Sequence, residues 1–169
     1  HFEGVDCWDR VVPSESPPYP PDAAALHHVF PGGWIWILRF NNGITSAGAA
    51  LADPLAATLQ ASDGAPAWDR LMRALPSVGE QFQTARATLP FVHAPRVAFR
   101  CREVAGEKWA LLPSAAGVID PLLSTGFPLT LLGVVRLGEA LKADWNDDDS
   151  LAAALRRYEA RTLDERDLA

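Results

Sequence analysis

The chain has 169 residues, of which 49% are hydrophobic and 21% are charged, a composition that is typical of a folded globular protein and excludes a disordered or fibrous one. Its formal net charge of −6, without any run of Lys and Arg, argues against a nucleic-acid partner, because phosphates require a basic surface. No uninterrupted apolar stretch of about 20 residues is present, and Cys7 and Cys101 have no second pair, so we expect no membrane span and no disulfide framework, but a protein of the reducing cytoplasm.

The first third of the chain predicts a loop followed by a sheet. The proline-rich segment "VPSESPPYPPDAAA", residues 12–25, should be an extended surface loop, because proline fixes φ and lacks an N–H donor. Aromatic and β-branched runs then predict three antiparallel strands at residues 26–30, 34–40 and 44–50, joined by Pro-Gly-Gly and Asn-Asn-Gly turns. Because side chains alternate along a strand, Trp34 and Trp36 should share a face.

Helical patterns follow from Asp53 to about Ala87. An Asp-Pro pair is a helix-start signal, and the segment "PAWDRLMRALP" places Trp68, Leu71, Met72 and Leu75 on one helix face. A third short helix should cover "SVGEQFQTA". The alternation in "RVAFRCREVAG" then predicts a half-buried strand, which would pair with "KWALLP" across a Gly-Glu turn.

Two longer helices are expected near the end of the chain, at residues 127–142 and 149–166. The acidic run Asp147, Asp148 and Asp149 precedes the second of them. Acidic residues at this position usually cap a helix and interact with its dipole, so we favour caps over a cation site and expect no metal. Since the chain starts at His1 and ends in charged helical sequence, we also expect it to be part of a longer protein.

The stretch from Pro113 to Gly126 combines small residues with a helix start. The predicted strand ends at Pro113, small residues follow, and Ser124 and Thr125 are candidate N-caps for the helix that begins near Gly126. The free N–H groups and positive dipole end of that helix favour an electron-rich or anionic group, such as a carbonyl or a halide. A tightly packed strand-turn-helix junction is the alternative interpretation of the same residues.

The segment "WALLPSAAGVIDPLLSTGFPLTLLGVVRLGEAL" resembles the second flavin motif of the FAD-dependent monooxygenase, geranylgeranyl reductase and tryptophan halogenase superfamily, W-x-L-x-G-D-A-A-G-x-x-D-P-x-x-S-x-G. Upstream, "GGWIWILRFNNGITSAGAAL" resembles the sheet that carries G-W-x-W-x-I-P in halogenases. The resemblance implies an α/β fold in which a mixed or antiparallel sheet packs on helices and a strand-turn-helix contacts FAD. The cofactor-binding residues that it implies are Ser114, Ala115, Ala116, Gly117, Asp120, Pro121, Ser124, Thr125 and Gly126.

The resemblance also implies a separate role for each of two parts of the chain. Residues 1–105 would form a substrate-binding sheet with helices, and residues 106–169 the second half of the FAD-binding region. Trp34 and Trp36 would be either core or the wall of a pocket for an aromatic substrate, with His28 beside them, because adjacent strand histidines cannot both face one site. Thr125 and Gly126 would hold a halide in a halogenase.

Three positions depart from the family pattern. Pro113-Ser114 replaces Gly-Asp, whose carboxylate binds the ribityl chain of FAD in the family, Leu123 stands where tryptophan halogenases have Glu, and Arg39 replaces the proline of W-x-W-x-I-P. The catalytic lysine and the G-x-G-x-x-G fingerprint belong to the family's N-terminal portion, so we assign no catalytic residue and expect the isolated chain to be inactive.

The expected activity is redox chemistry at reduced flavin on an aromatic or apolar small molecule, of the halogenase or monooxygenase type. A flavin reductase is a candidate partner for such an enzyme. A reductase of the geranylgeranyl reductase type is the second interpretation. The third is a flavoprotein-like binding module that has lost FAD, which the Pro113-Ser114 departure favours.

Overall fold

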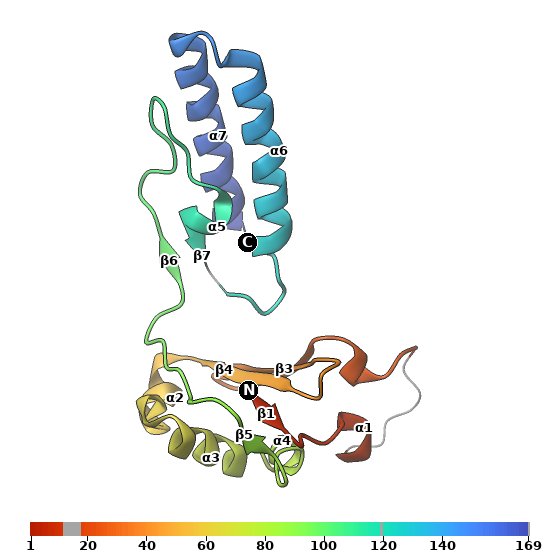
Figure 1. Cartoon of the computed structure of the whole chain (residues 1–169). Coiled ribbons are helices and arrows are strands. Elements are labelled where there is room, and N and C mark those ends of the chain that lie inside the picture. The colour runs from red at the N-terminus through yellow and green to blue at the C-terminus, as the bar shows by residue number, and fades with distance from the viewer. Residues whose placement is uncertain (12–17, 119, 169) are drawn as a thin grey trace. The chain divides into compact units, whose positions relative to one another are not determined.

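The computed structural model describes residues 1–11, 18–118 and 120–168. It divides into two compact units, His1–Pro95 and Arg96–Ala169, a division that falls before the boundary expected at residue 105 (Figure 1). Each unit has its own sheet and its own helices.

Unit 1, His1–Pro95, contains a five-stranded sheet in the order β2-β3-β4-β1-β5, in which every pair of neighbours is antiparallel. The predicted three-stranded meander is confirmed, with its strands within one residue of the expected bounds. The strands are β1 Phe2–Glu3, β2 Leu26–Phe30, β3 Gly33–Arg39, β4 Thr45–Leu51 and β5 Arg86–Ala87.

The turns of the meander follow from local chemistry. Gly32 and Gly43 have φ values of 88° and 82°, a left-handed conformation that side chains disfavour. The Asn42 side chain accepts a hydrogen bond from the Ile44 N–H at 3.1 Å and so closes the second turn. These turns set the register in which Trp36 pairs with His27 on one side and Gly48 on the other.

The helices of unit 1 lie along one face of this sheet (Figure 1). Ile35 and Ile37 project from β3 into the core, where they pack with Phe2, Trp68 and Leu71. The two helices predicted to begin near Asp53 and Ala65 are confirmed, whereas the third, expected over residues 77–85, ends at Glu80. Met72 and Leu75 pack against the same core. The helices of this unit are α1 Trp8–Val11, α2 Asp53–Thr58, α3 Ala65–Ala74 and α4 Pro76–Glu80, with short 3-10 turns at Pro21–Ala23 and Ala61–Asp63.

Unit 2, Arg96–Ala169, is built on a helical hairpin of α6 and α7 (Figure 1). Both long helices were predicted, and both are confirmed. A small core of Val104, Ala116 and Tyr158 joins the hairpin to the preceding segment, and the Tyr158 hydroxyl donates to the Leu111 carbonyl at 2.8 Å. The elements of this unit are β6 Phe99–Arg100, α5 Pro113–Ala116, β7 Gly117–Val118, α6 Gly126–Asp144 and α7 Asp148–Leu168.

The strand predicted for residues 96–106 is largely wrong. Only Phe99–Arg100 is a strand, and its partner is β7 rather than the segment "KWALLP". Val97 and Phe99 are exposed, so the alternation does not bury one face. Pairing with residues 108–113 is limited to one bridge between Ala105 and Ala110. The Glu159 carboxylate accepts hydrogen bonds from the N–H groups of residues 104 and 105, which explains why the ladder is interrupted there.

Two further expectations need correction. Pro113 does not end a strand but starts one helical turn, α5, because proline suits the first position of a helix. The proline-rich segment was expected to be extended, but Pro21–Ala23 forms a 3-10 turn, and residues 12–17 lie outside the described residues. Among the helices of the described residues, none is long and apolar enough to cross a membrane.

Candidate functional site

A cavity of about 210 Å³ lies within unit 2, between α5, the loop before α6, and α7. The sequence predicts that residues 114–117 and 124–126 meet around one concave surface, and this is confirmed. Of the nine residues predicted to bind a cofactor, all but Ala115 line the cavity. The lining residues are Pro113, Ser114, Ala116, Gly117, Val118, Asp120, Pro121, Ser124, Thr125, Gly126, Phe127, Leu129, Thr162 and Glu165.

The start of α6 faces this cavity. The helix begins at Gly126, as predicted, and neither Ser124 nor Thr125 caps it through a side chain, contrary to expectation. The Phe127 N–H donates to the Ser124 carbonyl at 3.1 Å and is therefore not free. Within the described part of the chain, no acceptor bonds the N–H groups of Thr125 and Gly126. These two N–H groups can therefore donate to a ligand, which the positive end of the helix dipole would also attract.

The loop before α6 is a tight turn. The Ser124 N–H donates to the Pro121 carbonyl at 3.0 Å, and Ser124 itself has a φ of 54°, which is uncommon for a residue with a side chain. Asp120 accepts a hydrogen bond from the Leu122 N–H at 2.8 Å. A β-carbon added to Gly126 would meet no atom within 4 Å, so the space over this residue is open to a ligand.

Packing explains why a proline is accommodated at position 113, where the sequence departs from the family pattern. A β-carbon on Gly133 of α6 would lie 2.4 Å from the Pro113 ring, so this proline packs directly on the helix backbone. Gly133 thus allows close packing of α6, whereas a β-carbon on Gly138 would meet no atom within 4 Å. Ser114 lines the cavity and offers a hydroxyl where the family pattern has a carboxylate.

Two lining residues come from α7, which the sequence reading did not connect with the site. Glu165 forms ion pairs with Arg136 of α6 and, at 3.0 Å, with Arg161. The hydrogen bond from Arg136 holds the pKa of Glu165 below its ordinary value, against an opposing effect of burial. Thr162 lies one helical turn earlier on the same helix face. Only the spacing of Arg161 and Glu165 is visible in the sequence, and it says nothing of a cavity.

In unit 1, the sheet face opposite the helices carries an aromatic cluster. Trp34 and Trp36 share this face as predicted, with ring centroids 5.8 Å apart, and the His27 ring lies 5.2 Å from Trp34. A β-carbon on Gly48 would lie 2.3 Å from the Trp36 ring, so this ring lies across β4. The two tryptophans are therefore outside the core that Ile35 and Ile37 form with the helices, although Trp34 is itself buried at 7% exposure.

His28 does not share this face. It pairs with Ile35 and projects to the helix side of the sheet, because successive strand residues point in opposite directions. Its ring lies 4.6 Å from the Trp8 ring, and its Nε2 is 3.1 Å from the Gln81 side-chain nitrogen. Burial lowers the pKa of His28. The histidine beside the tryptophans is His27, so the grouping of His28 with them is corrected.

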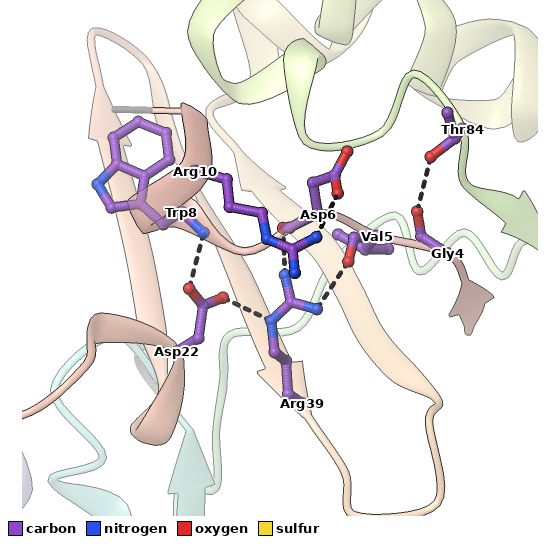
Figure 2. A network of polar contacts seen from close by, with 8 residues as sticks. All are labelled: Gly4, Val5, Asp6, Trp8, Arg10, Asp22, Arg39 and Thr84. Carbon is purple, nitrogen blue, oxygen red and sulfur yellow. Dashed lines mark hydrogen bonds and ion pairs between the residues drawn. The ribbon is translucent and has the colours of Figure 1, made fainter. Parts of the chain in front are cut away.

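Arg39, which stands at the third departure from the family pattern, ties the N-terminal segment to the sheet (Figure 2). Its guanidinium donates to the Asp22 carboxylate at 2.5 Å, to the Val5 carbonyl at 2.8 Å and to the Asp6 carbonyl. Asp22 also accepts from the Trp8 N–H at 2.7 Å. The planar guanidinium suits this fork of acceptors, and proline could make none of these bonds.

The acidic run before α7 acts as a cap, as predicted. Asp147 accepts hydrogen bonds from the N–H groups of Asp149 and Ser150 at 3.1 and 3.2 Å. These bonds, led by that from the Ser150 backbone, hold the pKa of Asp147 below its ordinary value. Within the residues that the structure describes, no group of three His, Cys, Asp or Glu side chains could hold a metal ion.

The sequence of the chain is similar to the sequences of known halogenases. The chain is 35% identical over 161 residues to tetracycline 7-halogenase of Kitasatospora aureofaciens, a match that covers 88% of the chain and 28% of that protein. It is 30% identical over 155 residues to monodechloroaminopyrrolnitrin halogenase PrnC of Pseudomonas fluorescens, covering 88% of the chain and 27% of that protein. No family model matches the chain.

Solved structures agree in fold. The halogenase PltM in complex with phloroglucinol and FAD superposes with a TM-score of 0.80 at 24% identity, covering 96% of the chain and 34% of PltM. A variant of PltM in complex with FAD gives a TM-score of 0.79 at 25% identity. The resemblance read from the two sequence motifs is thereby confirmed. The chain spans less than a third of the length of the two curated relatives named above.

Proposed function

The chain is homologous to flavin-dependent halogenases over most of its length, and we propose that it forms the part of such an enzyme that holds the flavin ring and one wall of the substrate pocket. In this proposal unit 2 carries the ring site and unit 1 the substrate wall. The bound FAD would supply the redox chemistry. The chain's own residues would bind and orient the flavin ring and shield it from water.

The observation that carries the proposal is the start of α6. The N–H groups of Thr125 and Gly126 have no acceptor in the described part of the chain, and the space over Gly126 is open. A carbonyl on a flat ring fits this arrangement, because it accepts from backbone donors and needs a surface without side chains. The surrounding lining is mostly small or apolar, which also suits a ring system.

The size of the cavity supports part of a dinucleotide rather than the whole. Its volume of about 210 Å³ is below the range of about 300–1,000 Å³ of pockets that enclose a drug-sized ligand. Ser114 would contact the ribityl chain through a hydroxyl, which makes a weaker hydrogen bond than the carboxylate of the family pattern. Thr125 and Gly126 are also the residues that would donate to a halide.

The substrate wall is proposed to be the face of Trp34 and Trp36. Their rings, tilted by 56° to each other, form an aromatic surface outside the helix core of unit 1, in which Trp34 is 7% exposed. Aromatic rings can contact an aromatic substrate face to face with an offset or edge to face. PltM has been crystallised with phloroglucinol, an aromatic compound. An enzyme of this kind would require a supply of reduced flavin, for which a flavin reductase is the proposed partner, in the cytoplasm.

One observation favours a second candidate, a binding module that has lost FAD. The carboxylate that holds the ribityl chain in the family pattern is absent, and Pro113, beside Ser114, packs directly against Gly133. The visible absorption spectrum of the purified full-length protein separates the two candidates. A flavin spectrum supports the enzyme, and a protein that stays colourless after incubation with FAD supports the module.

A matched pair of glycine variants tests the ring site itself. Both Gly126 and Gly138 have open space where a β-carbon would be, but only Gly126 lines the cavity. We expect Gly126→Leu to abolish flavin binding while the circular dichroism spectrum and melting temperature stay near those of the parent protein. Gly138→Leu should leave flavin binding unchanged. Equal flavin binding by both variants would mean that residues 113–126 form a tightly packed structural junction and not a flavin site.

A further inference from the structure

The α7 side of the cavity carries polar groups that the flavin motif does not include. Glu165 and Thr162 both line the cavity, and the Glu165 side chain is only 19% exposed. Thr162 is 4% exposed, and its hydroxyl has no hydrogen bond of good geometry among the described residues. Burial raises the pKa of the Tyr158 phenol on the same helix, against an opposing effect of Thr162. A buried polar group in this state costs free energy unless a ligand satisfies it.

Glu165 is held as an ionised acceptor. The hydrogen bond from Arg136 and the contact with Arg161 keep its pKa low, so the carboxylate accepts hydrogen bonds and does not donate. Each contact uses one carboxylate oxygen, Oε2 for Arg136 and Oε1 for Arg161. A carboxylate has about four lone-pair sites, so acceptor capacity remains for a group in the cavity. The two arginines also fix the side chain, which removes the entropic cost of orienting it.

The cavity therefore offers donors from one element and an acceptor from another. Thr125 and Gly126 present N–H groups at the start of α6, and Glu165 presents oxygen from α7. A ligand edge that satisfies both must carry an acceptor and a donor side by side. A cyclic imide has this pattern, C=O, N–H, C=O, and the pyrimidine edge of an isoalloxazine ring is a cyclic imide.

We propose that Glu165 is a ligand-binding residue that accepts the imide N–H of the flavin, with Thr162 beside it as a second polar contact. The inference rests on the proposed function, since it assigns residues of α7 to the same ring site. The charged side chains among the lining residues are Asp120 and Glu165, and both are acidic, so each can accept a hydrogen bond from an N–H donor.

The test is a titration of the 169-residue chain, followed through its backbone amide NMR signals, with riboflavin 5′-phosphate and with the same flavin methylated at the imide nitrogen. Inorganic phosphate serves as a control for binding through the phosphate. We expect the flavin to shift the Thr125 and Gly126 signals. Methylation removes the imide donor, so it should weaken binding about tenfold or more, the effect of losing a hydrogen bond to a charged group.

Variants of Glu165 then identify the acceptor. Glu165→Leu should bind both flavins equally, since the acceptor that distinguishes them is gone. Asp164→Asn is the matched control, because Asp164 is exposed on the same helix and does not line the cavity, and it should discriminate as the parent does. Discrimination between the two flavins that persists in Glu165→Leu would overturn the assignment.

A third variant covers the case in which Glu165→Leu fails to fold because Arg136 loses its partner. Thr162→Val removes the unsatisfied hydroxyl, so it should fold as well as the parent while binding the flavin several-fold more weakly. Unchanged flavin affinity in Thr162→Val would contradict the inference. No shift of Thr125 and Gly126 in the parent chain at millimolar flavin would instead contradict the proposed function, so the two failures are distinguishable.

Discussion

The two units bury their apolar residues to very different extents. In unit 1, β3 projects Ile35 and Ile37, at 0% and 1% exposure, against helices that cover that sheet face. In unit 2, the long helix α6 leaves a row of apolar side chains at 47–71% exposure, namely Phe127, Leu131, Leu132, Val134 and Val135. Yet unit 2 contains the cavity. Unit 1 therefore has a closed core of its own, whereas one apolar face of α6 is not covered by the residues that the structure describes.

The largest effect is expected in the core of unit 1. Replacing Ile35 by Ala removes a fully buried side chain, which should lower the free energy of unfolding of unit 1 by about 3 kcal/mol. The matched change Val134→Ala on α6 should cost less than about 0.5 kcal/mol, because that side chain is already in water. Urea titrations followed by amide signals of each unit measure both. Comparable losses would mean that the α6 face is buried in solution.

A second comparison concerns Arg39 and Arg10, two arginines that contact the N-terminal segment of unit 1 (Figure 2). Arg39→Met leaves the Asp22 carboxylate, which is 9% exposed, without its ion-pair partner, and we expect a loss of about 2–3 kcal/mol. Arg10→Met breaks an exposed pair with Asp6 at 3.6 Å and should cost less than about 0.5 kcal/mol. Hydrogen exchange of residues 1–11 should accelerate only in the Arg39 variant. Similar exchange in both would show that the Arg39 contacts do not hold this segment.

Within unit 2, two glycines of α6 allow a sharper comparison. Gly133→Ala puts a methyl group 2.4 Å from the Pro113 ring, so α5 must move, and we expect a loss of about 1–3 kcal/mol together with weaker flavin binding. Gly138→Ala meets open space and should stabilise the helix by about 0.5–1 kcal/mol. Thermal melting of both variants tests the pair. A stabilising Gly133→Ala would mean that α5 is not packed on α6.

The smallest effect is a pH dependence in unit 1. Burial lowers the pKa of His28 below the ordinary 6.5, with Asp22 raising it and His27 lowering it further. The unfolded chain therefore binds the proton more readily, so His28 stabilises the fold fully above about pH 6.5 and loses this contribution as the pH falls through its folded-state pKa. Unfolding free energies between about pH 7.5 and 5 should fall less steeply in His28→Gln. The exposed His93→Gln should keep the parent slope.

Much of this molecule could be predicted from local patterns. The Asn-Asn-Gly turn, the period-2 runs and the helix-start signals each involve a few neighbouring residues, and the meander, α3, α6 and α7 followed from them. The two loops of the cavity were also found, because small residues before a helix start are a local signal. The strand at residues 96–106 was not, because the Glu159 carboxylate from a distant helix takes the N–H groups that the ladder would need.

The sequence by itself determined where the strands of the meander and the long helices begin, which residues of the meander share a face, and which small residues leave room at the start of α6. Only the tertiary structure decided that Arg39 joins Asp22, 17 residues away, that Glu165 pairs with Arg136, 29 residues away, and that His28 meets Gln81, 53 residues away. The physical reason is that turn geometry and periodicity act over a few residues of chain. A carboxylate at a cavity wall depends on which distant segments the core brings together, and no local pattern records that.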